Sequence, residues 1–288
     1  MISVIRGAMF SAILLACTSV LFADFTPKWN QPLAPYRVIS NIYYVGTNYL
    51  ASFLITTPQG NILINPDYEQ SVPLIRSSVE KLGFKFSDIK IILISHAHDD
   101  HAAGCALAKK WTGARLMVMD ADVAEVENGG AGDFQYRQHW TPVKVDRILH
   151  DGDRVVLGGV TLVAHLTPGH TKGCTTWITE VKDAGHLYHV VIVGSPNVND
   201  GYKLVGNTNY PQIATDYEKT FRVLSSLPCD VFLGAHGVYY DMDAKLKRLQ
   251  TGGPNPFIDP AGYRAYVAER GAAFRTELAR QQHKATAP

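Results

Sequence analysis

The stretch His96-Ala97-His98-Asp99-Asp100-His101 is the most informative part of this chain. It places four possible metal ligands, three imidazoles and the carboxylate of Asp100, within six residues. The apolar run at 91–94 predicts a buried strand, so these ligands would lie at the lip of a sheet, before a helix that begins near Ala102. Imidazole and carboxylate groups are ligands that zinc accepts. Because four crowded donors cannot easily reach one ion, the stretch predicts two.

Two further histidines follow predicted strands in the same way. His170 lies in Pro168-Gly169-His170-Thr171 after the strand predicted at 160–166, and His236 lies in Gly234-Ala235-His236-Gly237 after the strand ending at 233. A glycine beside a histidine lets the backbone approach closely. Either histidine alone would more often be structural, but three strand-end loops that carry histidine favour a metal centre. Six donors are enough for two Zn²⁺ ions with open positions, as catalytic zinc requires: His96, His98, His170, Asp100, His101 and His236.

The composition is that of an ordinary globular protein. The 288 residues carry a formal net charge of +1, with 46% hydrophobic and 18% charged residues. Lysine and arginine are scattered, and no glycine-rich phosphate loop is visible. These features give no electrostatic case for binding nucleic acid or an anionic membrane, so the expected partner is a small-molecule substrate.

The N-terminus has the pattern of a secretory signal peptide. Arg6 precedes a short apolar core, and small residues lie near Ala23, which predicts cleavage after residue 23 and a periplasmic protein. The segment is too short and too weakly flanked for a transmembrane anchor. Leu14-Leu15-Ala16-Cys17 also loosely matches a lipoprotein box, which would leave a lipidated Cys17. We expect a single domain over residues 24–288 and a monomer without stable membrane insertion.

Hydrophobic periodicity predicts two sheets packed face to face with helices outside, a four-layer αββα sandwich of the α/β (α+β) class. Strands are predicted at 37–45, 51–56, 61–64, 89–94, 116–119, 147–149, 155–157, 160–166, 175–179, 187–193 and 229–233. Helices are predicted at 72–82, 102–111, 121–127, 213–227, 242–249 and 263–281. A glycine-rich loop from Gly129 to about Thr141 is expected to be flexible.

The cysteines do not form a disulfide framework. Without Cys17, three remain, Cys105, Cys174 and Cys229, which is an odd number. Each is expected to be a small buried apolar residue. One disulfide is possible, but the sequence does not choose the pair.

The three histidine motifs resemble the metallo-β-lactamase superfamily, over about residues 29–281. Hydrolases of the glyoxalase II type carry a bridging Asp after the strand that follows Pro-Gly-His, and the first two subclasses of class B β-lactamases carry a Cys near this position. This chain has Ser195 there, in Val193-Gly194-Ser195-Pro196-Asn197, while His101 completes the second site. That arrangement resembles the third subclass of class B β-lactamases, which has an all-His/Asp di-zinc site, and so implies the metallo-β-lactamase fold.

The resemblance also implies a role for each residue. His96, His98 and His170 would hold the first zinc, and Asp100, His101 and His236 the second, with Asp100 and His236 counted as catalytic. Ser195 would bind the substrate carboxylate, with Asn199 as a helper, and Asp99 would be solvated. Three aromatic residues fit ordinary packing as well as they fit substrate contact: Trp29, Phe134 and Tyr136. A disulfide that many members form from the residue matching Cys229 lacks its partner here, because the last helix reads Pro260-Ala-Gly-Tyr263.

The implied function is a zinc β-lactamase that hydrolyses the amide of penicillins, cephalosporins and carbapenems with a metal-bound hydroxide and so confers antibiotic resistance. A second hypothesis is another hydrolase on this fold, such as a lactonase or thioesterase. The absence of the bridging Asp, which Ser195 replaces, argues against it. A third is a non-catalytic metal-binding protein of the cell envelope, which would have little use for open metal positions.

Overall fold

The computed structural model describes residues 28, 30–136 and 138–286. The predicted signal peptide, Cys17 and Trp29 lie outside the described residues. The single domain expected over 24–288 stays a prediction. Among the described residues, no helix is both long and apolar enough to cross a membrane.

The first half of the chain forms a seven-stranded sheet in which spatial order follows sequence order. Its strands are β1 (Tyr36–Ile39), β2 (Ile42–Tyr44), β3 (Phe53–Thr57), β4 (Gly60–Ile64), β5 (Ile89–Leu93), β6 (Arg115–Met119) and β7 (Arg147–Leu149). Strands β1 to β4 pair antiparallel, whereas β4 to β7 pair parallel. Parallel neighbours need crossovers, and the helices between β4 and β7 provide them. The strand expected at 147–149 is present as the last strand of this sheet.

The second sheet has five strands in the order β12-β11-β10-β9-β8. They are β8 (Arg154–Leu157), β9 (Val160–Leu166), β10 (Thr175–Asp183), β11 (His186–Val193) and β12 (Val231–Gly234). Strands β8 to β11 pair antiparallel, and β12 joins β11 in parallel. As a result β11 and β12 end at the same edge of the sheet.

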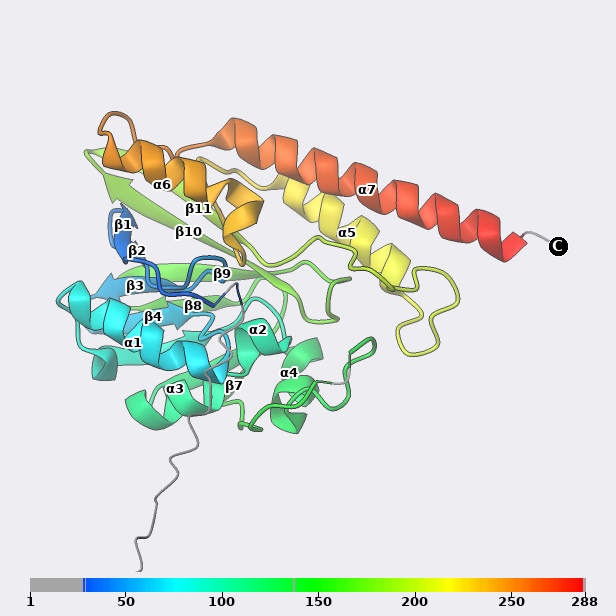
Figure 1. The fold of residues 1–288 in the computed structure, drawn as a ribbon, viewed down its shortest axis with the longest axis horizontal. Helices are drawn as coiled ribbons and strands as arrows, with labels where there is room; N and C mark the ends of the chain where they lie inside the picture. The colour runs from blue at the N-terminus through cyan, green and yellow to red at the C-terminus, as the bar shows by residue number, and fades with distance from the viewer. Residues whose placement is uncertain (1–27, 29, 137, 287–288) are drawn as a thin grey trace, which may run out of the picture.

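Helices cover the outer face of each sheet (Figure 1). On the first sheet lie α1 (Val72–Lys81), α2 (Asp99–Ala102), α3 (Cys105–Thr112) and α4 (Asp120–Asn128). On the second lie α5 (Ile213–Ser226), α6 (Met242–Gln250) and α7 (Pro260–Thr286). Short 3₁₀ turns η1 (Glu69–Ser71), η2 (Phe86–Asp88) and η3 (Gly237–Tyr240) complete the elements. This arrangement confirms the expected αββα sandwich.

Two hydrophobic layers follow from the alternation of side chains along the central strands. Leu93 of β5 and Met117 of β6 face the second sheet, whereas their neighbours Ile92 and Leu116 pack under the outer helices. Trp177 of β10 lies in the layer between the sheets, and its indole nitrogen donates a 3.0 Å hydrogen bond to the carbonyl of Ile94. This bond joins the two sheets beneath the 96–101 loop.

Three details differ from the sequence prediction. The single strand expected at 37–45 is two strands, because Ser40 adopts a left-handed conformation with φ 48° and turns the chain. The helix expected at 102–111 is divided, since the amide of Gly104 bonds the carbonyl of Asp67 at 2.7 Å between α2 and α3. A β-carbon at Gly104 would lie 2.4 Å from the Pro66 carbonyl, so only glycine fits. The last helix is longer than expected and covers 260–286.

The three cysteines of the described residues are free thiols. Cys105 and Cys174 are buried, as expected for small apolar residues, and Cys229 is half-buried.

Candidate metal centre

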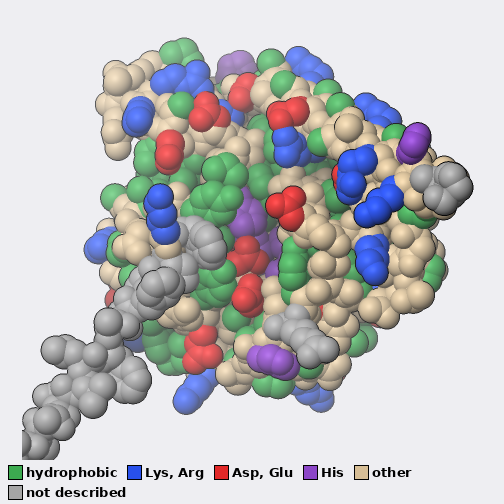
Figure 2. All heavy atoms as spheres, turned by 45° about the vertical axis from the view of Figure 1, so that its right-hand side comes forward, with side chains coloured by type: hydrophobic (Ala, Val, Ile, Leu, Met, Phe, Trp, Pro, Cys, Tyr) green, Lys and Arg blue, Asp and Glu red, His purple; other side chains and the backbone are tan. Residues whose placement is uncertain are grey.

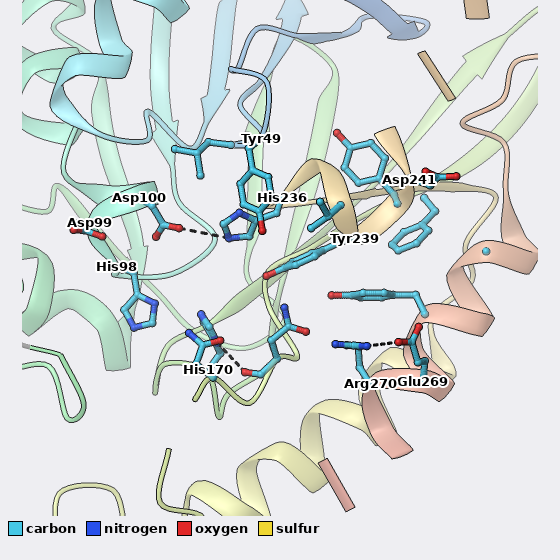
Figure 3. Close-up of a pocket in the computed structure, with 18 of the residues that line it drawn as sticks. Tyr49, His98, Asp99, Asp100, His170, His236, Tyr239, Asp241, Glu269 and Arg270 are labelled. Carbon is cyan, nitrogen blue, oxygen red and sulfur yellow. Dashed lines mark hydrogen bonds and ion pairs between the residues drawn. The ribbon is translucent and has the colours of Figure 1, made fainter. Parts of the chain in front are cut away.

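The structure brings all six predicted donors to one edge of the two sheets. His96 and His98 follow β5, Asp100 and His101 lie on the short α2, His170 follows β9, and His236 follows β12. The side chains of four of them, His98, Asp100, His170 and His236, line a common cavity that α7 also borders (Figure 3). The backbone of Gly169 has φ 127°, and a β-carbon there would lie 2.7 Å from the Tyr217 ring. The close approach expected for the glycine beside His170 is therefore present.

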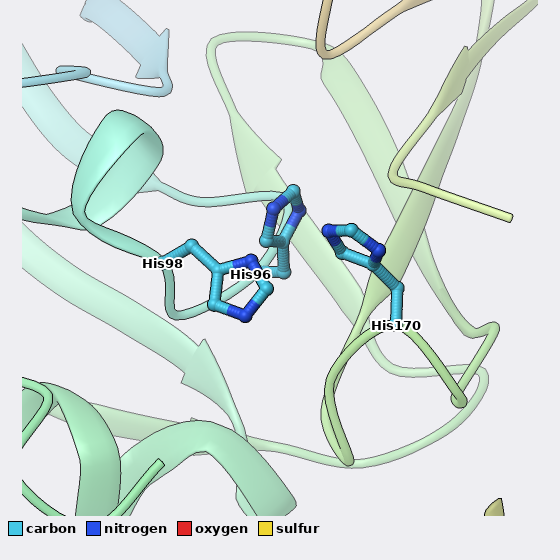
Figure 4. Close-up of side chains that lie close together, drawn as sticks. All are labelled: His96, His98 and His170. Atoms are coloured by element: carbon cyan, nitrogen blue, oxygen red, sulfur yellow. The ribbon is translucent and has the colours of Figure 1, made fainter. Parts of the chain in front are cut away.

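His96, His98 and His170 form the first cluster (Figure 4). One ligand atom from each lies within 4.8 Å of the other two. Nδ1 of His170 lies 2.9 Å from the backbone carbonyl of Asn197. A carbonyl oxygen can only accept, so Nδ1 donates this bond and Nε2 keeps a free lone pair for a metal.

Asp100, His101 and His236 form the second cluster. Nε2 of His101 lies 3.0 Å from Nε2 of His236, and Oδ2 of Asp100 lies 3.5 Å from each of these atoms. Zinc bonds to nitrogen and oxygen of about 2.0–2.1 Å place neighbouring tetrahedral ligands about 3.3 Å apart. The three atoms already have this spacing.

Burial keeps most of these imidazoles neutral. It lowers the pKa of His96 and His170 well below the usual value, and neighbouring imidazoles lower them further. Burial likewise lowers the pKa of His101 and of His236 to about 3. Neutral imidazole is the form that binds metal. Nε2 of His96 is buried and has no hydrogen-bond partner among the described residues, as a metal-facing atom would.

His98 is the exception, because an acidic residue from the glycine-rich loop lies beside it. Oδ2 of Asp133 lies 3.6 Å from Nε2 of His98. Burial alone would lower the pKa of His98, but the Asp133 carboxylate outweighs burial and raises it. Asp133 also accepts backbone N–H groups of Gln135 and Tyr136, which hold it in place. At 3.6 Å the contact between Asp133 and His98 is too long for a hydrogen bond, and Nε2 of His98, like that of His96, has no hydrogen-bond partner among the described residues.

Two buried carboxylates that the sequence analysis missed support the clusters. Asp67, which follows β4, receives a 2.6 Å hydrogen bond from Ser52 and lies 3.9 Å from Nδ1 of His101. Its position after a strand could have singled it out by the rule that found the histidines. Asp122 on α4 bonds both the His96–His101 loop and the loop after His170, and no local sequence signal marks it.

Both clusters contribute residues to the lining of a cavity of about 840 Å³, whereas His96 and His101 are buried behind it. On the surface, histidine and acidic side chains are recessed in a hollow (Figure 2). The residues of the predicted site that line it are His98, Asp99, Asp100, Tyr136, His170, Asn199 and His236. The amide of Asn199 donates to the hydroxyl of Tyr136 at 3.1 Å. Phe134 instead packs against Tyr202 and Tyr210, with ring centroids 5.2 and 5.0 Å apart.

Ser195 follows β11 as expected, but it does not reach the cavity. It is 1% exposed, and its hydroxyl lies 3.0 Å from the hydroxyl of Tyr239, which does line the cavity. Tyr239 therefore presents a hydroxyl where the sequence analysis expected that of Ser195.

Asp99 is not freely solvated, contrary to expectation. It is half-buried, and its carboxylate accepts a 3.3 Å hydrogen bond from the side-chain amide of Gln138. Burial, together with the nearby Asp100, raises the pKa of Asp99. The residue thus holds the glycine-rich loop against the start of α2.

Comparison with known proteins places this fold and site in one family. Residues 46–236 match the family model described as "Metallo-beta-lactamase superfamily". The FEZ-1 metallo-β-lactamase from Legionella gormanii is 53% identical, with a TM-score of 0.87 over 88% of this chain and 98% of that one. BJP-1, a subclass B3 metallo-β-lactamase of Bradyrhizobium japonicum, is 42% identical, with a TM-score of 0.84 over 89% and 98%.

Curated sequence relatives are more distant and match over shorter segments. A hydroxyacylglutathione hydrolase of Rhodopseudomonas palustris is 29% identical over 41% of this chain and 39% of its own length. An atrochrysone carboxyl ACP thioesterase of Aspergillus fumigatus is 26% identical over 70% of this chain and 40% of its own. The chain thus spans only about 40% of these relatives.

Proposed function

This chain belongs to the metallo-β-lactamase superfamily of hydrolases, and from that premise we propose that it is a zinc-dependent β-lactamase. Its proposed substrates are penicillins, cephalosporins and carbapenems, and its proposed role is antibiotic resistance. The observation that carries the proposal is the second cluster. Asp100, His101 and His236 converge there within 3.5 Å, while Ser195 stands where a metal-bridging Asp or a Cys ligand would lie in other branches.

Two zinc ions fit the six donors, as the free buried Nε2 of His96 and the spacing of the second cluster indicate. His96, His98 and His170 would hold one ion, and Asp100, His101 and His236 the other. Bound zinc would polarise the substrate carbonyl and lower the pKa of water toward about 7, which provides a nucleophile at neutral pH. Asp100 would orient the attacking water, because its Oδ2 lies 3.5 Å from Nε2 of both His101 and His236.

Protein groups around the clusters would orient the β-lactam. Asn199 and Tyr136 line the cavity beside His170 and could hydrogen-bond the substrate. Ser195 would act through Tyr239, since the two hydroxyls are 3.0 Å apart and only that of Tyr239 lines the cavity. The substrate carboxylate would therefore meet Tyr239 directly and Ser195 indirectly.

A thioesterase is the second candidate, because curated relatives of the chain include hydroxyacylglutathione hydrolases and an acyl-carrier-protein thioesterase. Identity to the FEZ-1 enzyme over nearly the full length of that chain favours the β-lactamase. Rates on a carbapenem and on a hydroxyacylglutathione thioester, measured with the same zinc-loaded protein, separate the two.

The deciding experiment is carbapenem hydrolysis by the purified protein, followed by ultraviolet absorbance. We expect turnover that a zinc chelator abolishes and added zinc restores. His236→Ala should abolish turnover and leave the circular dichroism spectrum unchanged. A protein shown to hold two zinc ions that turns over the thioester but no β-lactam would contradict the proposal.

We also propose that residues 1–23 direct export to the periplasm and are then removed. A separate proposal is that the mature protein is a monomer. The intact mass of protein purified from a periplasmic extract tests the first proposal, since cleavage after Ala23 and lipidation of Cys17 give different masses. Light scattering of the same sample reports the oligomeric state.

A further inference from the structure

We propose that Arg270 of α7 binds a second negative charge on the substrate, at the end of the cavity formed by α7. This inference rests on the proposed β-lactamase function and deepens it, because it assigns a substrate class. This second charge is a carboxylate on a side-chain substituent of the β-lactam. It is distinct from the ring carboxylate that penicillins share.

One face of α7 forms a wall of the cavity. Gly262, Ala265, Tyr266, Glu269 and Arg270 line it, at the spacing of successive turns of one helix face. Ala265 is small and leaves room, whereas Tyr266 and Arg270 are long and polar. At Gly262 the space is taken by the Asp259 carboxylate, 2.1 Å from where a β-carbon would lie. In Figure 3 Arg270 and Glu269 lie on the opposite side of the cavity from His98 and Asp99. A substrate whose amide sits at the metal donors could therefore extend a substituent toward Arg270.

Arg270 has an N–H donor that no acceptor in the described part of the chain satisfies. Its ion pair is with Glu269, the adjacent residue on the same helix. This pair lies within α7 and does not connect the helix to another element. An arginine with a purely structural role would be expected to form such a connection. Nε of Arg270 is buried and has no hydrogen-bond partner among the described residues. A guanidinium has five N–H donors in a planar fork that matches a carboxylate.

The surroundings of Arg270 are also suited to a carboxylate. The hydroxyl of Tyr266, one turn earlier, is buried and without a hydrogen-bond partner among the described residues. The Tyr266 ring stacks on Tyr239, with centroids 5.3 Å apart, which places these two residues in a row along the cavity wall. Arg270 also borders a neighbouring hollow with Asn197 and Asn199, so the arginine faces the loop after β11. The carboxylates of Asp200 and Glu277 border that hollow too, with Arg280 beside them.

Glu269 is the one carboxylate paired with Arg270 in the described part of the chain, and a bound substrate carboxylate would compete with it. The Glu269 side chain is 67% exposed, compared with 33% for Arg270, so water can solvate it when the pair opens. Removing the charge of Glu269 should therefore strengthen binding of an anionic substituent.

Carbenicillin and benzylpenicillin form a matched pair of probes, because they differ by one carboxylate on the side chain. With zinc-loaded Arg270→Ala we expect KM for carbenicillin to rise about 3- to 5-fold, as for a partly exposed charge pair, and KM for benzylpenicillin to change less than about 2-fold. The kcat values should stay unchanged, because Arg270 lies away from the reacting amide. Glu269→Gln should lower KM for carbenicillin. Arg264→Ala removes an exposed charge from the same helix and serves as the control.

Every outcome other than these contradicts a specific claim. If Arg270→Ala matches Arg264→Ala on both penicillins, the assignment of Arg270 is wrong while the β-lactamase function stands. If KM rises equally for both, Arg270 binds the shared ring carboxylate and the second-charge inference is wrong. If the zinc-loaded wild type hydrolyses the carbapenem but neither penicillin, the second-charge inference is wrong while the β-lactamase function stands. If it hydrolyses no β-lactam at all, the proposed function itself is wrong and this inference fails with it.

Discussion

Nε2 of His101 lies 3.0 Å from Nε2 of His236, although 135 positions separate the two residues in the chain. His101 comes from α2, beside the seven-stranded sheet, and His236 follows the last strand of the five-stranded sheet. The second cluster therefore exists only when the two sheets are packed together. A metal ion bound there would link the two halves of the fold.

Replacing His101 tests this cluster. His101→Ala leaves Asp100 and His236, which are too few ligands for a tight site. We expect the zinc content to fall from two ions to one per chain and kcat for a carbapenem to fall roughly 100-fold or more. Elemental analysis and ultraviolet assays measure these. His150→Ala, at an exposed position, is the control, and equal zinc content in both variants would contradict the assignment.

The hydrogen bond between Ser195 and Tyr239 predicts non-additive mutations. A neutral hydrogen bond contributes about 0.5–1.5 kcal/mol, so Ser195→Ala and Tyr239→Phe should each raise KM for benzylpenicillin roughly 2- to 10-fold. If Ser195 acts through Tyr239, the double variant should be no worse than the more affected single variant. Independent, additive effects would show that Ser195 contacts the substrate by another route.

Asp122 is predicted to fix the positions of the two histidine loops. Its carboxylate accepts hydrogen bonds from the amide of Ala97 at 2.9 Å, the hydroxyl of Thr171 at 2.8 Å and the amide of Gly173 at 2.7 Å. Asp122→Asn would replace one acceptor oxygen with an NH₂ group, which would then face one of these N–H or O–H donors. We expect zinc affinity to fall about 10-fold or more, as for other groups that orient ligands, when measured by competition with a chelating dye.

The matched control for this variant is Asp120→Asn, an exposed position on the same helix. If both variants bind zinc as the wild type does, Asp122 has only a packing role.

Asp259 predicts a pH dependence of stability. It lies 2.8 Å from the buried ammonium of Lys245, and it also accepts the amide of Gly262 near the start of α7. Burial would raise the pKa of Asp259, but the Lys245 ion pair and the Gly262 amide outweigh it and lower the pKa. A carboxylate with a lowered folded-state pKa stabilises the fold above its unfolded pKa of about 3.9, and this contribution is lost as the pH falls through the folded value.

Asp259→Asn should therefore lower the free energy of unfolding by about 1 kcal/mol, a modest value because the partly exposed carboxylate is screened by water. Urea unfolding should show the same difference between wild type and variant at about pH 5 and pH 7, and a smaller difference toward about pH 3. Asp243→Asn, at an exposed position in α6, is the control. A difference that grows as the pH falls would contradict the assignment.

Much of the site was predictable because its residues follow strands. A buried strand reads as a short apolar run, and the polar residues directly after it must lie at the edge of the sheet. This rule led to His96, His170 and His236, and it could have led to Asp67. It could not lead to Asp122 or Arg270, because these lie in helices, and only the packing of the helices directs them toward the site.

The roles around the substrate were less predictable for the same reason. Ser195 was correctly expected after β11, but the burial of its hydroxyl behind Tyr239 depends on how η3 packs against β12. Asp133 reaches His98 through a loop whose sequence indicates only turns. Neither contact has a signature in local sequence.

The sequence by itself determined the candidate metal donors, the two-sheet class and the likeness to one superfamily, because these depend on residue type, spacing and periodicity along the chain. Tertiary structure alone decided which side chains face the cavity, which carboxylates support the histidines and where Arg270 lies. The physical reason is that these properties depend on contacts between segments far apart in the chain. The energy of such contacts exists only once the two sheets and α7 have packed together.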